Sequence, residues 1–277
     1  MISIVMTVYN IENYIEKAIN SVLNQEYSDI ELILVNDCST DNSLNIINSF
    51  TDPRIKCICN DINRGAGYSR KVGIENASGE YVITIDGDDW IEPSFLKNLY
   101  YNSDNCDMVF GGMTFDFENG ESKRFNTQFG IFSGLSKFEL VKKKKIIFLN
   151  TCLVKRDLYK LVSYDVKRYN EDTPTLTKLL YFSEKIKIVD EFGYHYLQHN
   201  ASLCHNSNEF FKHLCLLQTG IDLIEFFSDK PYEYRHMVTI NDLYLHMSYL
   251  NDLENIVKYQ DAFNKAMLGF INRIQRE

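Results

Sequence analysis

Residues 63–90 read NRGAGYSRKVGIENASGEYVITIDGDDW and contain, in order, a glycine-rich turn, a helix, a strand and an acidic cluster. The helix is expected at about 67–77, before Gly79, because glycine readily adopts the left-handed conformation that closes a helix. The apolar run 81–85 is typical of a strand buried on both faces. This stretch therefore predicts a helix that leads into a central strand, which ends in carboxylates.

The chain before this stretch repeats the same order of elements. Strands are expected at 2–8, 31–35 and 55–59, and apolar residues recur at three- and four-residue spacing over 11–23 and 44–50. Strands that alternate with helices indicate an α/β fold with a Rossmann-like, mostly parallel central sheet flanked by helices.

The remaining chain divides into two further parts. Residues 101–205 are less periodic, with strand-like runs at 107–117 and 186–190, and resemble a second portion of the sheet. Residues 206–277 are expected to form a C-terminal helical extension, whose apolar positions follow helical spacing. Two interpretations of these positions stay open: packing on the rest of the chain, or a surface for homo-oligomerisation or membrane contact.

Composition excludes several classes of protein. The 277 residues carry a formal net charge of -9, and 45% of them are hydrophobic, which argues against a nucleic-acid partner and against wholesale disorder. The short basic run 142–145 is typical of a solvated helix end, although contact with an anionic membrane stays open. Without a signal-like start, a 20-residue apolar run or a cysteine framework, the chain is expected in the cytoplasm, with the inner face of the membrane as an alternative.

Three polar turns follow three predicted strands: TVYN (7–10), NDCSTD (36–41) and DGDDW (86–90). In open parallel sheets, ligands bind outside the carboxyl ends of the strands. Turns are commonly polar, but they do not require clustered aspartates. The three turns are therefore expected to line one ligand-binding crevice.

Asp86, Asp88 and Asp89 place three carboxylates within four residues. Such groups repel one another unless a cation lies between them, and strand alternation would turn Asp86 and Asp88 to the same side. Mg²⁺ or Mn²⁺ held there would bridge a diphosphate. The alternative is capping of the next helix, in which Pro93 is expected in the first turn.

Other candidate ligand-binding residues lie in the turns. Asp37 could accept hydrogen bonds from a ribose or a base, or form a local turn with Ser39. Asn63 and Arg70 flank the glycine-rich turn, and Arg70 could pair with phosphate in a bidentate manner. The glycines alone are a weak signal, because the full dinucleotide-binding pattern is missing.

A second acidic pair, Glu171 and Asp172, lies in YNEDTPT. Transfer to a hydroxyl requires a base, and a carboxylate suits that role if its pocket raises the pKa. An acidic pair before Thr-Pro is also typical of a helix N-terminus, so both interpretations remain open.

The ordered segments IVMTVYN, ELILVNDCSTDNS, NRGAGYSRKVGIENASGEYVITIDGDDW and NEDTPT resemble glycosyltransferase family 2, the inverting enzymes of the GT-A fold. The resemblance is dense over 1–92 and looser over 170–205. It departs from the family pattern at Thr7, where proline is usual, and at Asn36, where the first aspartate of DDGS is usual. Neither departure removes the metal or base candidates.

The resemblance implies roles for individual residues. Thr7, Tyr9 and Asp37 match positions that hold the base and ribose, and Arg70 and Asp86 match donor-binding positions. Asp88 matches the principal ligand of a divalent metal, Mn²⁺ or Mg²⁺.

Two further roles are implied for residues after 170. Asp172 matches the catalytic base, and His199 lies in the aromatic-rich segment that follows it, where it is a candidate ligand on the donor or metal side. A lone histidine is more often structural.

The expected function is transfer of a hexose or N-acetylhexosamine from a nucleotide diphosphate, with UDP favoured, to an acceptor hydroxyl on a glycan, glycolipid or glycoprotein. Residues 1–100 are then the nucleotide-sugar-binding half and 101–205 the acceptor-binding half of one domain. The alternative is a catalytically inactive module that binds a sugar nucleotide or a glycan. A nucleotidyltransferase or a dehydrogenase would be expected to have a glycine-rich first turn, and TVYN has no glycine.

Overall fold

The computed structural model describes residues 1–125, 128–142, 148–163, 171–199, 209–231 and 234. These residues fall into two compact units: 1–166 with 175–199, and 167–174 with 200–277. The first unit contains two β-sheets, and the second contributes helix α9 (Glu209–Phe227) to the described part.

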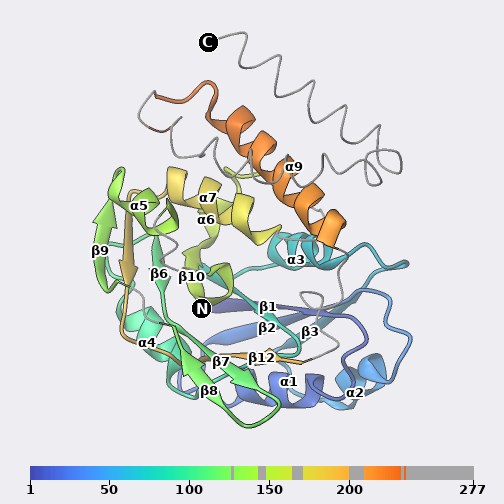
Figure 1. Cartoon of the computed structure of the whole chain (residues 1–277). Helices are drawn as coiled ribbons and strands as arrows, with labels where there is room; N and C mark the ends of the chain where they lie inside the picture. The colour runs from blue at the N-terminus through green and yellow to red at the C-terminus, as the bar shows by residue number, and fades with distance from the viewer. Residues whose placement is uncertain (126–127, 143–147, 164–170, 200–208, 232–233, 235–277) are drawn as a thin grey trace. The chain divides into compact units, whose positions relative to one another are not determined.

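The large sheet of the first unit has eight strands in the order β3-β2-β1-β4-β10-β6-β11-β9. Register pairs show that six of them run in one direction, whereas β9 and β10 run against their neighbours. The expected mostly parallel α/β sheet is therefore confirmed (Figure 1). Its strands, in sheet order, are β3 (Ile55–Cys59), β2 (Ile30–Asn36), β1 (Ile2–Val8), β4 (Tyr81–Asp86), β10 (Cys152–Lys155), β6 (Met108–Phe110), β11 (Lys185–Ile188) and β9 (Gly130–Ser133).

Helices cover both faces of this sheet because its central strands are apolar throughout. Helix α1 (Ile15–Leu23) buries its apolar stripe in one core cluster with Ile4 and Met6 of β1. On the opposite face, α3 (Ala66–Glu75) lies so close that a Cβ on Gly73 would stand 2.2 Å from Val5 Cγ1. Figure 1 shows α1 and α2 (Ser43–Ser49) on the side of the sheet away from α3.

A second sheet has four strands in the order β5-β12-β7-β8. The strands are β5 (Trp90–Ile91), β12 (Tyr194–Gln198), β7 (Met113–Phe117) and β8 (Ser122–Arg124). Because β5 follows directly after the acidic turn, this small sheet joins residues near 90 to residues near 195.

The strand-like run at 107–117 is not one strand, which corrects the prediction. It divides at Gly111 and Gly112 into β6 of the large sheet and β7 of the small sheet. A Cβ on Gly111 would stand 2.7 Å from Phe95 Cε2, and one on Gly112 would stand 2.4 Å from Phe192 Cδ1. Only a chain without side chains at both positions can pass these rings.

The remaining helices are predicted only in part by the sequence, and some helices begin at other residues than expected. They are α4 (Phe95–Tyr101), α5 (Ser136–Lys142), α6 (Arg156–Tyr159) and α7 (Asp172–Phe182), with a short 3₁₀ turn at Leu149–Thr151. Pro93 lies before α4, whose N-cap is Ser94, so its expected place in the first turn is wrong. Likewise α1 begins at Ile15 rather than near residue 11, after a turn that Asn10 enters at φ 51°.

The expected C-terminal helical region is confirmed where the structure describes it. Among the α9 residues whose side chains are described, the buried ones recur at every fourth position, which is the stripe that helical spacing predicts. These residues are Cys215, Thr219, Leu223 and Phe227. The predicted apolar positions from 237 to 274, and residues 143–145 of the basic run, lie outside the described residues. In the part that is described, no helix has the length and apolarity to cross a membrane.

Candidate active site at the acidic turn

The acidic cluster lies in a tight turn between β4 and β5, at the carboxyl end of β4. The Asp89 backbone N–H donates to the Asp86 carbonyl oxygen across 3.0 Å and closes the turn. A Cβ on Gly87 would stand 2.7 Å from the Thr7 carbonyl oxygen and 2.4 Å from Ile11 Cδ1. Close approach to β1 therefore requires glycine here, and it fixes the positions of the carboxylates on either side.

Asp86 is the last residue of β4, and its two oxygens have different partners. Arg70 donates to Oδ1 across 2.8 Å, and Thr7 Oγ1 donates to the same oxygen across 3.5 Å. Asn150 Nδ2 donates to Oδ2 across 2.7 Å. The Arg70 side chain is 7% exposed and that of Asp86 is 31% exposed, so the ion pair is buried on the arginine side only. The structure thus brings together three residues that the sequence predicted, Thr7, Arg70 and Asp86.

Asp88 lies beyond the strand, inside the turn. The argument from strand alternation is therefore wrong, because β4 has ended at Asp86. Asp88 Oδ2 lies 3.0 Å from His199 Nε2, and the imidazole ring of His199 packs against Tyr14 with centroids 4.7 Å apart. The hydrogen bond to Asp88 raises the pKa of the His199 side chain. The candidate histidine and the candidate metal ligand are thus direct neighbours.

Asp89 points into the interior. Its Oδ2 accepts the hydroxyl proton of Tyr194 across 2.5 Å, and its Oδ1 accepts the Leu197 N–H across 3.0 Å. Burial raises the pKa of this carboxyl group well above its ordinary range. In this arrangement Asp89 ties the turn to β12, and its place among the candidate site residues stays a prediction.

The expectation that a cation must separate the three carboxylates needs correction. Asp86 has Arg70 and Asn150, Asp88 has His199, and Asp89 has Tyr194 and Leu197. Each carboxylate is stabilised by its own donors, so proximity alone does not require a metal. Over the described residues, no group of three or more His, Cys, Asp or Glu side chains is arranged to hold a metal ion.

Asp37 follows β2 and shapes a neighbouring loop. Its carboxylate accepts hydrogen bonds from Asn60 Nδ2 at 2.7 Å, from the Arg64 N–H at 2.9 Å and from the Gly65 N–H at 2.7 Å. Gly65 has a φ of 90°, which glycine adopts without strain. Asp37 is 3% exposed, so it supports the Asn60–Gly65 loop, and contact with a ribose or base stays a prediction.

Other predicted donor residues lie at the surface of the same edge. Tyr9 comes directly after β1 and is 46% exposed, which leaves its ring accessible for stacking. Asn63 is exposed within the Asn60–Gly65 loop. Carboxyl ends of adjacent parallel strands meet at one edge of a sheet, so the turns after β1, β2 and β4 line a common border.

Glu171 and Asp172 belong to the second unit, at the start of α7. Asp172 Oδ1 accepts the Thr173 N–H across 2.9 Å, a contact typical of the first turn of a helix. The catalytic role expected for Asp172 stays a prediction.

Sequence reasoning missed three neighbours of the acidic turn: Asn150, Tyr194 and Tyr14. Tyr194 lies in the aromatic-rich segment before His199, and Asn150 lies in no recognised motif. No signal in the sequence distinguishes these residues from ordinary polar or core positions. Asn150 and Tyr194 reach the turn through pairing of β10 with β4 and of β12 with β5, which are contacts between distant segments.

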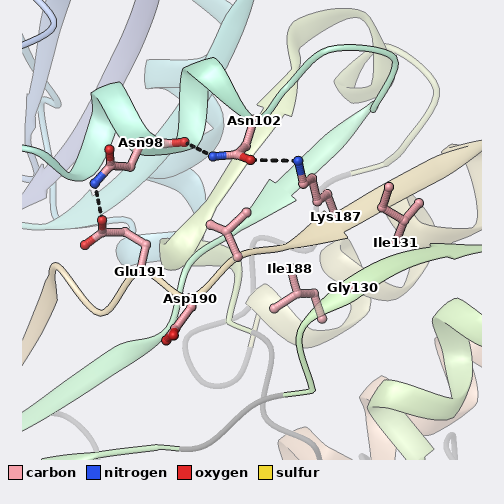
Figure 2. A pocket seen from close by; sticks show the side chains of 9 residues that line it. Asn98, Asn102, Gly130, Ile131, Lys187, Ile188, Asp190 and Glu191 are labelled. Atoms are coloured by element: carbon pink, nitrogen blue, oxygen red, sulfur yellow. Dashed lines mark hydrogen bonds between the residues drawn. The ribbon is translucent and has the colours of Figure 1, made fainter.

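A separate pocket of about 400 Å³ lies between α4, β9 and the segment from β11 to Glu191. Figure 2 shows hydrogen bonds that connect Asn98, Asn102, Lys187 and Glu191 along its wall. Asn102 donates to the Asn98 carbonyl oxygen at 2.8 Å, Lys187 donates to Asn102 at 2.7 Å, and Asn98 donates to Glu191. None of the site residues predicted from the sequence lines this pocket.

Comparison with solved structures defines the class of fold. TarS of S. aureus, solved in complex with UDP-GlcNAc, superposes with a TM-score of 0.75 at 20% identity, covering 98% of this chain and 81% of that chain. The mannosyltransferase PcManGT from Pyrobaculum calidifontis, in complex with GDP-Man and Mn²⁺, superposes with a TM-score of 0.61 at 15% identity, covering 100% of this chain and 75% of that chain. The fold is the GT-A fold, as the sequence predicted.

The chain belongs to glycosyl transferase family 2, because the sequence profile of that family matches residues 3–162. A relative in Streptococcus pneumoniae, the glycosyltransferase GlyA, is 31% identical over 217 residues. That alignment covers 73% of this chain and 31% of GlyA, so the chain spans about a third of the length of this relative.

Proposed function

We propose that this chain is an inverting glycosyltransferase that moves a sugar from a nucleotide diphosphate donor to an acceptor hydroxyl on a glycan, glycolipid or glycoprotein. The observation that carries the proposal is the acidic turn at the carboxyl edge of the sheet, where Asp86 and Asp88 lie beside the turn that carries Tyr9. Membership of glycosyl transferase family 2 supports glycosyl transfer as the reaction class. TarS, which shares this fold and was solved in complex with UDP-GlcNAc, supports a uridine donor.

The donor would lie along the edge formed by the turns after β1, β2 and β4. Tyr9 offers an exposed ring to the base, and Thr7 and Asp86 offer oxygens to the sugar hydroxyls. Asp37 would act by holding the loop that contains Asn63 and Gly65. Arg70 would neutralise the charge of Asp86 from the buried side of the ion pair. This would reduce the repulsion between the Asp86 carboxylate and a diphosphate.

The residues at Asp88 fit a divalent metal, Mn²⁺ or Mg²⁺. Asp88 and His199, whose Oδ2 and Nε2 atoms lie 3.0 Å apart, would hold the metal. Such a site completes its coordination with water and phosphate oxygens, so two protein ligands suffice. When bound, the metal would neutralise charge on the leaving diphosphate.

Asp172 is the proposed base, and it would take the proton from the acceptor hydroxyl as that oxygen attacks the anomeric carbon. A single displacement from the opposite face inverts the configuration of that carbon. We place the donor half in residues 1–100, the acceptor half in 101–205 and an extension in 206–277. Homo-oligomerisation through the extension, peripheral membrane contact and a cytoplasmic location belong to the same proposal.

The proposal is tested with a panel of UDP-, GDP- and dTDP-sugars, each with Mn²⁺, with Mg²⁺ and with chelator. Metal-dependent release of a nucleoside diphosphate from one sugar is expected. Asp88→Asn and Asp172→Asn should each lower turnover by on the order of 10²-fold or more. Asp157→Asn, which changes an exposed carboxylate on α6, is the matched control and should keep full activity.

Two outcomes would contradict parts of the proposal. Near-normal turnover of the Asp172→Asn protein would remove this residue as the base. A folded wild-type protein that binds a nucleotide sugar but never turns it over, with any metal or acceptor, would favour the catalytically inactive binding module.

A further inference from the structure

Asn150 reaches the acidic turn from a distant segment of the chain. It lies in the short 3₁₀ turn Leu149–Thr151, whose first and last residues are buried. This turn leads into β10, which pairs antiparallel with β4 through Val154 and Val82. The pairing brings the Asn150 side chain to the end of β4, where Asp86 lies.

Asn150 and Arg70 together fix the plane of the Asp86 carboxylate. Arg70 donates to Oδ1 across 2.8 Å and Asn150 donates to Oδ2 across 2.7 Å, so each oxygen has a donor on the protein side. Each oxygen of a carboxylate can accept more than one hydrogen bond. The 31% exposure of the side chain leaves further acceptor capacity facing outward.

The orientation of the Asn150 amide is itself determined. Thr84 Oγ1 donates to Asn150 Oδ1 across 3.4 Å, which turns Nδ2 toward the carboxylate. The Tyr194 hydroxyl lies 3.4 Å from the same Nδ2 and also donates to Asp89. An amide is required at this position because the side chain must accept a proton from Thr84 and donate one to Asp86.

We infer that Asn150 is a positioning residue for the nucleotide-sugar donor and acts through Asp86; the inference rests on the proposed function of this edge. With Asn150 in place, Arg70 donates to Oδ1 of Asp86 only. Oδ2 then stays oriented to accept a hydrogen bond from the nucleotide sugar. Without the Asn150 donor, the carboxylate is free to rotate and present both oxygens to the guanidinium group, since paired N–H···O bonds are the favoured geometry of that ion pair. The nucleotide sugar then loses the Asp86 oxygen that would accept its hydrogen bond.

A double-mutant cycle on nucleotide binding tests this inference. Binding of UDP, GDP and dTDP with Mn²⁺ is measured by calorimetry for wild type, Asn150→Ala, Asp86→Asn and the double variant. Asn150→Ala should lower the affinity for the nucleotide that binds wild type by about 10-fold or more. Loss of a hydrogen bond to a charged group typically has an effect of that size. In the Asp86→Asn background the same substitution should change binding by less than about 2-fold, because the charged carboxylate that Asn150 orients has gone.

The control is Asn102→Ala, which removes an amide that also bonds a charged side chain, Lys187, in the pocket of Figure 2. It should leave nucleotide binding unchanged. Should Asn150→Ala fail to fold, Asn150→Leu keeps a similar shape and removes the donor without adding a charge, and it should give the same loss. Equal losses from Asn150→Ala in both backgrounds would overturn the inference and leave the proposed function intact. Failure of folded wild type to bind any of the three nucleotides would instead contradict the proposed function.

Discussion

The first 90 residues and residues 102–199 contribute to the same site in different ways. The first region supplies the carboxylates, on strands and turns whose apolar and polar patterns are regular. The second supplies further partners: Asn150 from a 3₁₀ turn, Tyr194 and Leu197 from the short strand β12, and His199 from just after that strand. A motif therefore identifies the charged groups of this site. The contacts that determine their exposure, pairing and pKa come largely from elsewhere in the chain.

Three adjacent carboxylates show the consequence. Asp86 is ion-paired and partly exposed, Asp88 contacts a histidine, and Asp89 is buried against a tyrosine hydroxyl. Their sequence context is nearly identical, yet burial raises the pKa of Asp89 well above its ordinary range. The three carboxylates differ in part because β12 supplies the partners of Asp89 and the 3₁₀ turn before β10 supplies Asn150 to Asp86.

The largest effect on stability is expected from Tyr194→Phe. This change removes the donor to Asp89 Oδ2 inside a fully buried site and should lower the free energy of unfolding by about 1–3 kcal/mol. Tyr101→Phe is the matched control, because Tyr101 is 68% exposed and its hydroxyl contacts solvent; its effect should stay within about 0.5 kcal/mol. Urea unfolding measures both, and equal stability of the two variants would show that the Tyr194 hydroxyl does not stabilise the turn.

Much of the first region was predictable because its elements are locally encoded. Strands β1, β2, β3 and β4 appear where the apolar runs placed them, and α3 precedes β4 as expected. The errors lie at boundaries and at glycines. Gly111 and Gly112 divide one apolar run between two sheets, because the rings of Phe95 and Phe192 leave no room for a Cβ. Such crowding comes from residues distant in sequence, which periodicity does not detect.

The site was predictable to the extent that it consists of motif residues. The sequence indicated Thr7, Arg70 and Asp86 as candidates, and the structure places them in direct contact. It gave no indication of Asn150, since an asparagine outside any motif is typical of an ordinary turn. It also suggested a shared cation for carboxylates that have separate partners in the structure, because repulsion calculated from spacing ignores neighbours that other strands supply.

A pH-dependent effect is expected in the second region, at Lys137 on α5. This ammonium group is 2% exposed, donates to the Ser183 carbonyl oxygen, and burial lowers its pKa from 10.5 to about 8. Between these values the unfolded chain binds the extra proton, so the stability of the wild type should rise with pH above about 8. Relative to Lys137→Met, the gain from pH 7 to 10 should be on the order of 1–2 kcal/mol.

The matched control for this pH effect is Lys160→Met, because Lys160 is 69% exposed. Its stability difference from wild type should not change over the same pH range. Guanidinium unfolding at several pH values measures both differences. A pH-independent difference for Lys137→Met would show that the buried lysine keeps its ordinary pKa.

The smallest effect is expected in the first region, at Cys38 in the turn after β2. Cys38 has a φ of 61°, a conformation that costs a residue with a side chain about 1–2 kcal/mol. Glycine avoids this cost but loses about 0.5–1 kcal/mol of backbone entropy, so Cys38→Gly should stabilise the fold by about 0.5–1 kcal/mol. Cys57→Gly is the matched control, because Cys57 lies within β3 and glycine weakens a strand. Opposite signs for the two changes in thermal unfolding would show that the turn carries local strain. Destabilisation by both would mean that the Cys38 thiol, 3.7 Å from the Asp61 carbonyl oxygen, stabilises this turn by more than its φ costs.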